Sequence, residues 1–273
     1  MSDIFDKFRL NDQVAVVTGG VGLLGREFVR TLAQAGASVI IADINQPNVE
    51  SYAGMLQEDG YPVKGVLTNV TDPVSIKGLV DQTVKAFGRL DILVCSAAMD
   101  PKFDNTNTTS NSHAFEDYPL EAWQNALDVN LTGLFLCAQA AAKQMLKQNN
   151  GVIINICSTY GLVGPDQRLY ERPGNPQQYK PIFYSVTKAG VLGLTKYLAT
   201  YYAGKNIRAN ALTPGGVYND HNKLFNKNYS YRTVLGRMAN IDEMNGGLLF
   251  LASDASSYMT GSNLVIDGGW TAW

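Results

Sequence analysis

Short apolar segments alternate with longer segments of helical period along most of the chain. The apolar segments have the length and composition of buried strands. They occupy residues 13–18, 38–42, 63–67, 91–95, 152–157, 207–212 and 263–266. The segments between them repeat apolar residues every three or four positions, as amphipathic helices do. These helices are predicted over residues 22–35, 47–59, 73–87, 120–148, 182–203 and 241–252. Strands that alternate with helices pair in parallel, so the pattern predicts an α/β fold with one doubly wound sheet and helices on both faces.

Three polar segments interrupt this alternation. Residues 99–118 are rich in Asn, Thr and Ser, residues 164–181 form a polar insertion with prolines, and residues 217–238 are rich in tyrosine and basic side chains. All three lie between predicted elements, where site-forming loops belong, so we expect them to be substrate loops. No repeat or linker divides the chain, which predicts a single domain over residues 1–273. The stretch from 214 to 238 shows no regular pattern and is expected to be irregular.

Composition narrows the classes of function. The net charge of −2 offers no general attraction to nucleic acid or to anionic membranes. No segment approaches the ~20 consecutive apolar residues that span a bilayer. Three cysteines in apolar contexts argue against a disulfide framework, and two histidines without metal-ligand spacing argue against a metal site. We therefore expect a cytoplasmic protein with reduced cysteines, no metal, and no nucleic-acid or membrane partner.

A glycine-rich turn follows the first predicted strand. Gly20, Gly22 and Gly25 satisfy the pattern G-x-G-x-x-G between that strand and a helix. Glycines let the backbone approach a pyrophosphate, and the helix N-terminus supplies free N–H groups and a partial positive charge. The turn is thus a candidate dinucleotide-binding site; the alternative is a tight strand–helix connection without a ligand.

Asp43 ends the second predicted strand, where a carboxylate can accept hydrogen bonds from ribose hydroxyls. It would repel the 2′-phosphate of NADP, and residues 19–25 contain no Lys or Arg to compensate that phosphate. This arrangement favours NAD as the cofactor. The alternative is a solvated or helix-capping aspartate.

A tyrosine and a lysine lie four residues apart on a predicted helix. Tyr184 and Lys188 would share one face, and a nearby ammonium is expected to lower the pKa of the phenol towards neutral pH. Alone, this spacing is also that of a surface tyrosine and a solvated lysine. Ser158 ends a strand where its hydroxyl can point into a crevice, and Asn130 is a polar amide among apolar helix residues that needs a partner.

These motifs together resemble the short-chain dehydrogenase/reductase family over essentially the whole chain. The matching segments are TGGVGLLG, DVNLTG, INICS, YSVTK, IRANALTPGG and TGSNLVIDGG. The resemblance implies a Rossmann-like sheet of seven parallel strands in the order 3-2-1-4-5-6-7. It also implies a homo-oligomer, a tetramer or dimer, formed through the helices at 120–148 and 182–203. The C-terminal residues 268–273 are expected to reach across such an interface.

The resemblance also implies roles for individual residues. Tyr184 would be the catalytic acid/base, Ser158 would orient the substrate oxygen, Lys188 would bind the nicotinamide ribose and assist Tyr184, and Asn130 would hold a water in a proton relay to Lys188. Asn69 and Val70 match the place that meets adenine, and Val217 the place that meets the carboxamide. The residues expected to contact NAD are Gly19, Gly20, Gly22, Leu23, Leu24, Asp43, Asn69, Val70, Ser96, Ala97, Ala98, Tyr184, Lys188, Pro214, Gly215 and Val217.

Two departures from the family pattern concern the cofactor site. The segment Cys95-Ser96-Ala97-Ala98 stands where the family has N-N-A-G, and Leu23 stands where the branch of this length has glycine. These changes put some backbone contacts around the cofactor in doubt, but not the fold.

The substrate is expected to be a small polar molecule. Basic and aromatic residues in the segments 164–181 and 217–238 suit an anionic carbohydrate such as a sugar phosphate or a nucleotide sugar; the alternative is a set of solvated loops. TGGVGLLG, DPKF and YERPGNPQQYKP are similar to a subgroup of the family linked to flagellin modification and nonulosonic (legionaminic-type) sugar synthesis. Two other functions remain open: a 3-oxoacyl- or steroid-type reductase, and a non-catalytic NAD-binding protein on the same fold.

Overall fold

Seven parallel strands form one sheet in the order β3-β2-β1-β4-β5-β6-β7. This computed structural model describes residues 3–100, 114–171, 174 and 176–273. The strands are β1 (Val14–Thr18), β2 (Ser38–Asp43), β3 (Val63–Leu67), β4 (Ile92–Cys95), β5 (Gly151–Ile156), β6 (Ile207–Pro214) and β7 (Asn263–Ile266). The predicted sheet, its order and its parallel pairing are confirmed.

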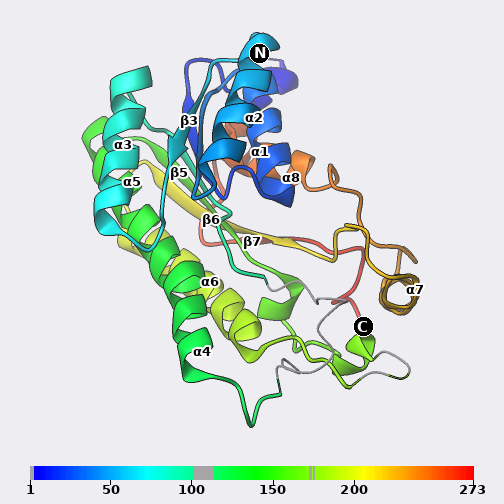
Figure 1. Cartoon of the computed structure of the whole chain (residues 1–273). Coiled ribbons are helices and arrows are strands. Elements are labelled where there is room, and N and C mark those ends of the chain that lie inside the picture. Colours follow the sequence, from blue (N-terminus) through cyan, green and yellow to red (C-terminus); the bar gives the residue numbers. More distant parts are fainter. Residues whose placement is uncertain (1–2, 101–113, 172–173, 175) are drawn as a thin grey trace.

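Helices cover both faces of the sheet (Figure 1). One face carries α1 (Leu23–Gln34), α2 (Gln46–Glu58) and α8 (Asn245–Ala252), and the other carries α3 (Pro73–Phe87), α5 (Gly133–Gln148) and α6 (Ile182–Tyr201). Neighbouring residues of a strand serve opposite cores: Val17 packs with Phe28 under the first set, and Val16 packs with Met145 under the second. Because both faces are buried, the strands read as continuous apolar runs rather than as alternating ones.

The strand order reverses at β1, which pairs with β2 on one side and with β4 on the other. In a sheet of this kind, ligands bind in the crevice beyond the carboxyl ends of the strands at the reversal point. The glycine-rich turn follows β1, Asp43 ends β2, and Ser96 follows β4. All three predicted cofactor segments therefore lie at the same edge of the sheet.

The helix predicted over residues 120–148 is interrupted. It consists of α4 (Leu120–Leu127), a π-helical turn at Asp128–Thr132, and α5. A π-helical turn widens the hydrogen-bonding pattern by one residue, and such turns are frequent at functional sites. Apolar periodicity does not reveal this one extra residue per turn, so the sequence pattern missed it.

The segment expected to be irregular from 214 to 238 contains a helix, α7 (Lys223–Arg232), and that expectation was wrong. The carboxamide oxygen of Asn222 accepts a hydrogen bond from the Phe225 backbone N–H at 2.9 Å and caps the helix N-terminus. Few apolar positions mark this helix because it buries mainly the Tyr229 side chain. The helix predicted from Ile241 begins instead at Asn245, after a turn.

Aromatic side chains form a third, smaller core. It contains Tyr160, Leu169, Tyr170, Tyr229, Met238 and Trp270. The ring of Trp270 stacks on that of Tyr229 with centroids 4.2 Å apart, and the indole N–H of Trp273 donates to the backbone oxygen of Arg232 at 3.1 Å. The C-terminal residues thus pack on α7 of the same chain. Their expected contact across a subunit interface stays a prediction. This core joins α7 and the C-terminus to the loop after β5.

Candidate active site

The glycine-rich turn is shaped by contacts between backbones. Gly19 has a φ of +67°, and a Cβ atom there would lie 2.8 Å from backbone atoms of Ala97. A Cβ atom at Gly25 would overlap the carbonyl oxygen of Gly19. These two glycines therefore pack the turn against the β4 loop and the first turn of α1.

The N-terminus of α1 fits a dinucleotide phosphate. Gly22 is its N-cap residue, and no side chain caps the helix. The first N–H groups of a helix need acceptors, and a pyrophosphate supplies them. Gly20, Gly22, Leu23 and Leu24 form this end of the helix, as the sequence predicts for the phosphate site.

The departure from the family pattern after β4 leaves the loop well fixed. The Thr18 hydroxyl oxygen accepts hydrogen bonds from the backbone N–H groups of Ser96 at 3.2 Å and of Ala97 at 3.3 Å. This buried threonine at the end of β1 ties the two loops together. Ala98 follows as an exposed residue. The changed sequence thus keeps the loop beside the glycine-rich turn.

Asp43 lies between the glycine-rich turn and the start of α2. Its carboxylate accepts a hydrogen bond from the Val21 N–H at 3.3 Å through one oxygen and from the Asn45 N–H at 3.1 Å through the other. Arg26 lies on the same turn: it donates to the Val21 carbonyl oxygen at 3.0 Å and its guanidinium stacks 4.6 Å from the centre of the Tyr52 ring. Sequence reasoning did not include Arg26, because it falls just after the glycine motif.

Asn69 and Val70 are engaged locally at the predicted adenine position. The carboxamide oxygen of Asn69 accepts from the Thr71 N–H at 3.0 Å and from the Thr71 hydroxyl at 2.8 Å. Val70 packs on α5, since a Cβ atom at Gly133 would lie 2.9 Å from its side chain. Asn69 therefore fixes the loop after β3.

Tyr184 and Lys188 extend from α6 towards the loop after β5. The Lys188 ammonium donates to the Ile156 carbonyl oxygen at 2.9 Å and lies 5.8 Å from the centre of the Tyr184 ring. The Ser158 side chain lies near enough to the Tyr184 phenol to lower its pKa, and the Ser158 hydroxyl oxygen accepts from the Tyr160 N–H at 3.2 Å. The structure thus brings together the three side chains that the sequence predicts as the acid/base, its lysine and the serine.

Burial changes the protonation of this pair. It raises the pKa of the Tyr184 phenol above its ordinary value; the Asp100 carboxylate raises that pKa further, and the Ser158 hydrogen bond lowers it. Burial also lowers the pKa of the Lys188 ammonium. Burial is the largest cause of the upward shift of the phenol pKa in the chain alone. The lowering expected from the Lys188 ammonium stays a prediction.

Asn130 lies in the π-helical turn and connects two segments of the site. Its carboxamide oxygen accepts from the Met99 N–H at 2.6 Å, and its nitrogen donates to the Met99 carbonyl oxygen at 3.1 Å and to the Thr187 hydroxyl at 3.4 Å. Asn130 thereby joins the loop after β4 to α6, between the positions of Tyr184 and Lys188. Its expected role in a water relay stays a prediction.

The turn after β6 closes another side of the crevice. Gly215 runs close to the strand-end residue Asp267, where a Cβ atom would lie 2.7 Å from the Asp267 Cα, and Pro214 is the last residue of β6. Val217 pairs with Ala239 in an isolated bridge. These contacts fix the segment predicted to meet the nicotinamide carboxamide.

Two ion pairs join the three predicted loops. Lys180 of the second loop pairs with Asp100 at the start of the first, and Arg232 of α7 pairs with Asp166 of the second. The guanidinium groups of Arg168 and Arg232 hold the pKa of Asp166 at about 2. Residues 101–113 of the first loop and 172, 173 and 175 of the second lie outside the described residues. Sequence reasoning included Lys180 only as one of several basic residues and gave no role to Asp100.

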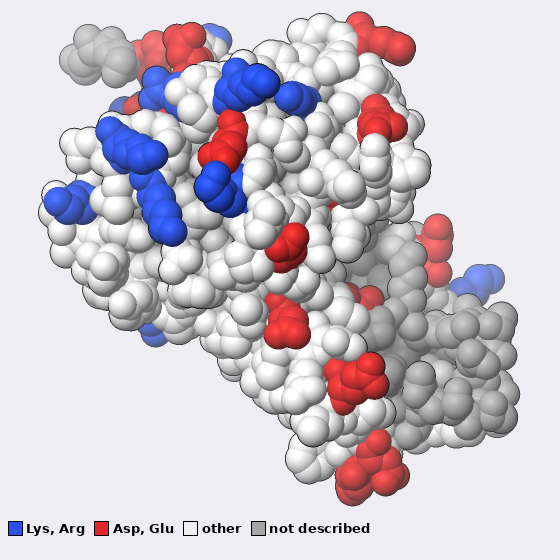
Figure 2. Space-filling view, turned by 60° about the vertical axis from the view of Figure 1, so that its left-hand side comes forward, with Lys and Arg blue, Asp and Glu red and all other residues white. Residues whose placement is uncertain are grey.

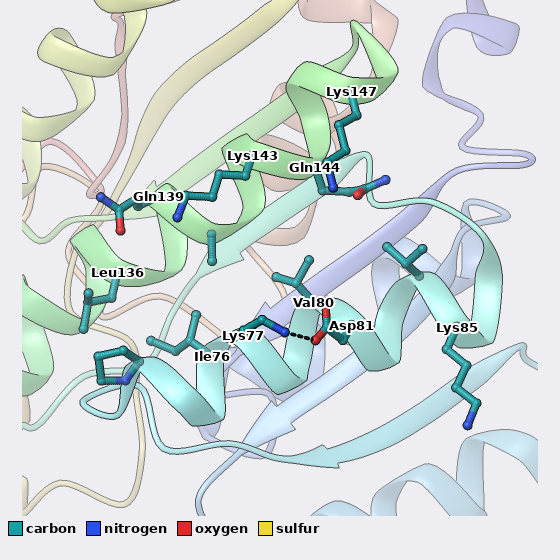
Figure 3. A pocket seen from close by; sticks show the side chains of 13 residues that line it. Ile76, Lys77, Val80, Asp81, Lys85, Leu136, Gln139, Lys143, Gln144 and Lys147 are labelled. Carbon is teal, nitrogen blue, oxygen red and sulfur yellow. Dashed lines mark hydrogen bonds and ion pairs between the residues drawn. The ribbon is translucent and has the colours of Figure 1, made fainter.

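A surface cavity lies away from these residues. It is a groove of about 650 Å³ between α3 and α5 (Figure 3). Four lysines line it, namely Lys77, Lys85, Lys143 and Lys147, and Lys77 pairs with Asp81 at 2.6 Å. Basic side chains gather on the upper part of the face shown in Figure 2, with acidic ones below them. No residue of the candidate site lines this groove.

The described residues contain neither a membrane-spanning helix nor a metal-binding cluster. No helix there is both long and apolar enough to cross a membrane. Within the same residues, no group of three or more His, Cys, Asp or Glu side chains is arranged to hold a metal ion. Cys95, Cys137 and Cys157 are buried and free.

The chain is similar to known oxidoreductases over nearly all of its length. A family model described as enoyl-(acyl carrier protein) reductase matches residues 22–271. A cis-4-hydroxycyclohexanecarboxylate dehydrogenase of Sinomonas cyclohexanicum is 34% identical, covering 96% of this chain and 97% of that protein. A 3-oxoacyl-[acyl-carrier-protein] reductase of Thermotoga maritima is 34% identical, covering 96% and 98%. A D-threitol dehydrogenase of Mycolicibacterium smegmatis is 32% identical, covering 97% and 95%.

Solved structures agree. A short-chain type dehydrogenase/reductase from Mycobacterium marinum has a TM-score of 0.86 at 34% identity, covering 100% of both chains. A gluconate 5-dehydrogenase from Burkholderia cenocepacia in complex with NADP and tartrate has a TM-score of 0.87 at 28% identity, covering 99% of this chain and 100% of that one. A short chain dehydrogenase from Leptospira borgpetersenii with bound NAD+ has a TM-score of 0.83 at 33% identity, covering 99% and 96%.

Proposed function

The chain belongs to the short-chain dehydrogenase/reductase family of oxidoreductases, which act on CH–OH groups. We propose that it uses NAD(H) to interconvert a secondary alcohol and a carbonyl on a sugar, a sugar phosphate or a nucleotide sugar. The observation that carries the proposal is the contact between Tyr184, Ser158 and the Lys188 end of α6 at the carboxyl edge of the sheet. A bound nicotinamide supplies hydride exchange at the substrate carbon.

The residues of the chain supply the proton. Tyr184 gives a proton to the substrate oxygen during reduction or takes it during oxidation, while Ser158 holds that oxygen by a hydrogen bond. Burial keeps the phenol protonated in the chain alone, which suits the role of acid. Oxidation requires the phenolate, and the positive charges of Lys188 and of an oxidised nicotinamide both favour it.

The proposed cofactor is NAD. Solved relatives contain either NAD+ or NADP, so family membership leaves both open. The Asp43 carboxylate on the Val21 N–H supports NAD, because it would repel a 2′-phosphate. Arg26, the nearest cation along the turn, is already engaged with the Val21 carbonyl oxygen and the Tyr52 ring.

A polar substrate is supported by the groups around Tyr184. Lys180 and Asp100 place charged atoms near the phenol. The names of two relatives, D-threitol dehydrogenase and gluconate 5-dehydrogenase, refer to polyhydroxylated substrates. None of the relatives described above is named for nonulosonic-sugar chemistry, so they give no support to the similarity with that subgroup. The proposal is made without it.

The second candidate is a 3-oxoacyl- or steroid-type reductase, favoured by the Thermotoga relative and by a 36% identical 3-alpha-(or 20-beta)-hydroxysteroid dehydrogenase of Mycobacterium tuberculosis. A buried ammonium over the Tyr184 ring is poorly suited to a long apolar ligand. A non-catalytic NAD-binding protein would not need the Tyr184, Ser158 and Lys188 arrangement.

A substrate panel tests the proposed function. Nicotinamide absorbance is followed with NAD and NADP over polyols, sugars, sugar phosphates, acyl thioesters and hydroxysteroids. We expect turnover with NAD and polyhydroxylated substrates. Turnover restricted to acyl thioesters or steroids would favour the second candidate, and tight cofactor binding without turnover on any class would favour the non-catalytic protein.

We also propose a cytoplasmic homo-oligomer. Large apolar side chains are exposed on α4, α5 and α6, namely Leu120, Phe135, Val186, Tyr197 and Tyr201. Exposed apolar surface of this kind is typical of subunit interfaces. Light scattering on the purified chain is expected to give the mass of a dimer or a tetramer; the mass of a monomer would contradict the proposal.

A further inference from the structure

A second lysine lies closer to the Tyr184 ring than the lysine of the motif. The ammonium of Lys180 lies 4.0 Å from the centre of the Tyr184 ring, against 5.8 Å for Lys188. Lys180 is only 9% exposed, and its ammonium pairs with the Asp100 carboxylate. A buried lysine is uncommon unless it has a partner or a function.

The backbone of Lys180 is held in place from both sides. The Gln167 carboxamide oxygen accepts from the Lys180 N–H at 2.8 Å, and its nitrogen donates to the Lys180 carbonyl oxygen at 3.2 Å. Gln167 is in turn held through its own backbone oxygen, which accepts from the Gln177 side chain at 3.2 Å. The insertion between Ser158 and Tyr184 thus positions one ammonium over the phenol ring.

The pair of Lys180 and Asp100 retains hydrogen-bonding capacity. An ammonium has three donors and a carboxylate has two acceptor oxygens. In the parts of the chain that the structure describes, the ammonium has one hydrogen bond, to Oδ1 of Asp100. The Asp100 side chain is 52% exposed. A donor and an acceptor therefore lie next to each other beside Tyr184, and both can bind a further molecule.

His221, which precedes α7, interacts electrostatically with the same pair. Burial lowers the pKa of His221, and the charges of both Asp100 and Lys180 act on this ring, Asp100 raising the pKa and Lys180 lowering it. Its Nδ1 accepts from the Asn219 N–H at 3.2 Å, so the neutral ring carries its proton on Nε2. A third polar side chain therefore lies within the electrostatic reach of the pair.

A hydroxyl group both donates and accepts, so two neighbouring hydroxyls match an adjacent carboxylate and ammonium. An anionic substrate group would be repelled by Asp100, and an apolar substrate would leave the buried ammonium without added partners. We propose that Lys180 and Asp100 form a substrate-binding pair that selects polyhydroxylated substrates by holding the hydroxyl groups next to the carbon that reacts at Tyr184. This inference rests on the proposed function and specifies its substrate class.

Kinetics on a matched pair of alcohols tests the proposal. D-threitol and 2-butanol share a four-carbon chain with a secondary alcohol, but only threitol has neighbouring hydroxyls. Lys180→Met removes the charge and keeps the length of the stem, and Asp100→Asn removes the charge of its partner. Lys205→Met is the control, because this exposed lysine precedes β6 at the opposite end of the strand.

We expect Lys180→Met and Asp100→Asn each to lower kcat/KM for threitol by about 10- to 100-fold, the loss expected for a charged hydrogen bond. The value for 2-butanol should change much less, because this alcohol has no neighbouring hydroxyl for the pair and responds only to the altered charge beside Tyr184. Lys205→Met should change neither value. An equal loss on both alcohols would overturn the proposal, since it would show an effect on Tyr184 or on folding. An unchanged threitol value would overturn it too.

A binding readout separates this inference from the proposed function. Threitol is expected to raise the melting temperature of the wild-type cofactor complex and not that of the Lys180→Met complex. Turnover of 2-butanol without preference for threitol contradicts the proposed role of Lys180 and Asp100 but leaves the proposed oxidoreductase activity standing. Absence of turnover on every alcohol, with the melting shift intact in the wild type and lost in the variant, contradicts the proposed activity while supporting the pair.

Discussion

Replacement of Tyr184 by phenylalanine is expected to lower kcat by about 10²- to 10⁴-fold, the range of a general acid/base contribution. The phenol lies beside Ser158, and the Lys188 ammonium lies 5.8 Å from the centre of its ring. Phe keeps the ring, so the edge contact with Tyr160 at 6.4 Å is retained. The variant should therefore fold and bind cofactor normally.

Steady-state kinetics and cofactor titration on the same preparation check this prediction. Tyr258→Phe is the matched control, because that side chain is fully exposed and precedes β7, at the opposite end of the sheet from the site. It should retain wild-type kcat. Full activity in Tyr184→Phe, on a substrate that the wild type turns over, would exclude the phenol as the proton-transferring group.

Replacement of Asp43 by asparagine is expected to reduce the preference for NAD over NADP by about 10- to 1000-fold, measured as the ratio of the two kcat/KM values. Two unit charges 4 Å apart interact by about 1 kcal/mol in water and about 4 kcal/mol at an effective dielectric constant near 20. Removing the charge removes a repulsion of that size. The carboxamide oxygen can still accept from the Val21 N–H, so the turn should remain folded.

The change should come mainly from better use of NADP. Asp59→Asn is the matched control, since Asp59 is an exposed residue at the far end of α2. It should leave the ratio unchanged. A wild-type preference for NADP, or an unaltered ratio in Asp43→Asn, would contradict the proposed role of the carboxylate and the choice of NAD.

The sequence pattern sufficed for the features that depend on local geometry. Alternating apolar and helical segments give the parallel sheet, because both faces of each strand are buried. A spacing of four residues on a helix places Tyr184 and Lys188 on one face whatever surrounds them. The glycine-rich turn is also local, since Gly25 has no room for a Cβ atom against Gly19.

Features that depend on tertiary packing could not be predicted in this way. The sign of the pKa shift at Tyr184 is set by burial in the folded chain. The position of Lys180 depends on Gln167, which lies 13 residues earlier in an insertion without a repeating pattern. Helix α7 buries mainly one side chain, Tyr229, so its apolar signal is weak. The partner of Asn130 is the backbone of Met99, which no side-chain pattern reveals.

The most direct measurement of the proposed chemistry is an absorbance titration of the Tyr184 phenol, with Tyr184→Phe as the blank, in the absence and presence of oxidised cofactor. Without cofactor, the phenol is expected to ionise above its ordinary pKa of 10.0, because burial raises that value. With NAD bound, the pKa should fall, because a positive charge then favours the phenolate. A phenol whose pKa is the same with and without NAD would contradict the proposal that Tyr184 exchanges its proton beside the nicotinamide.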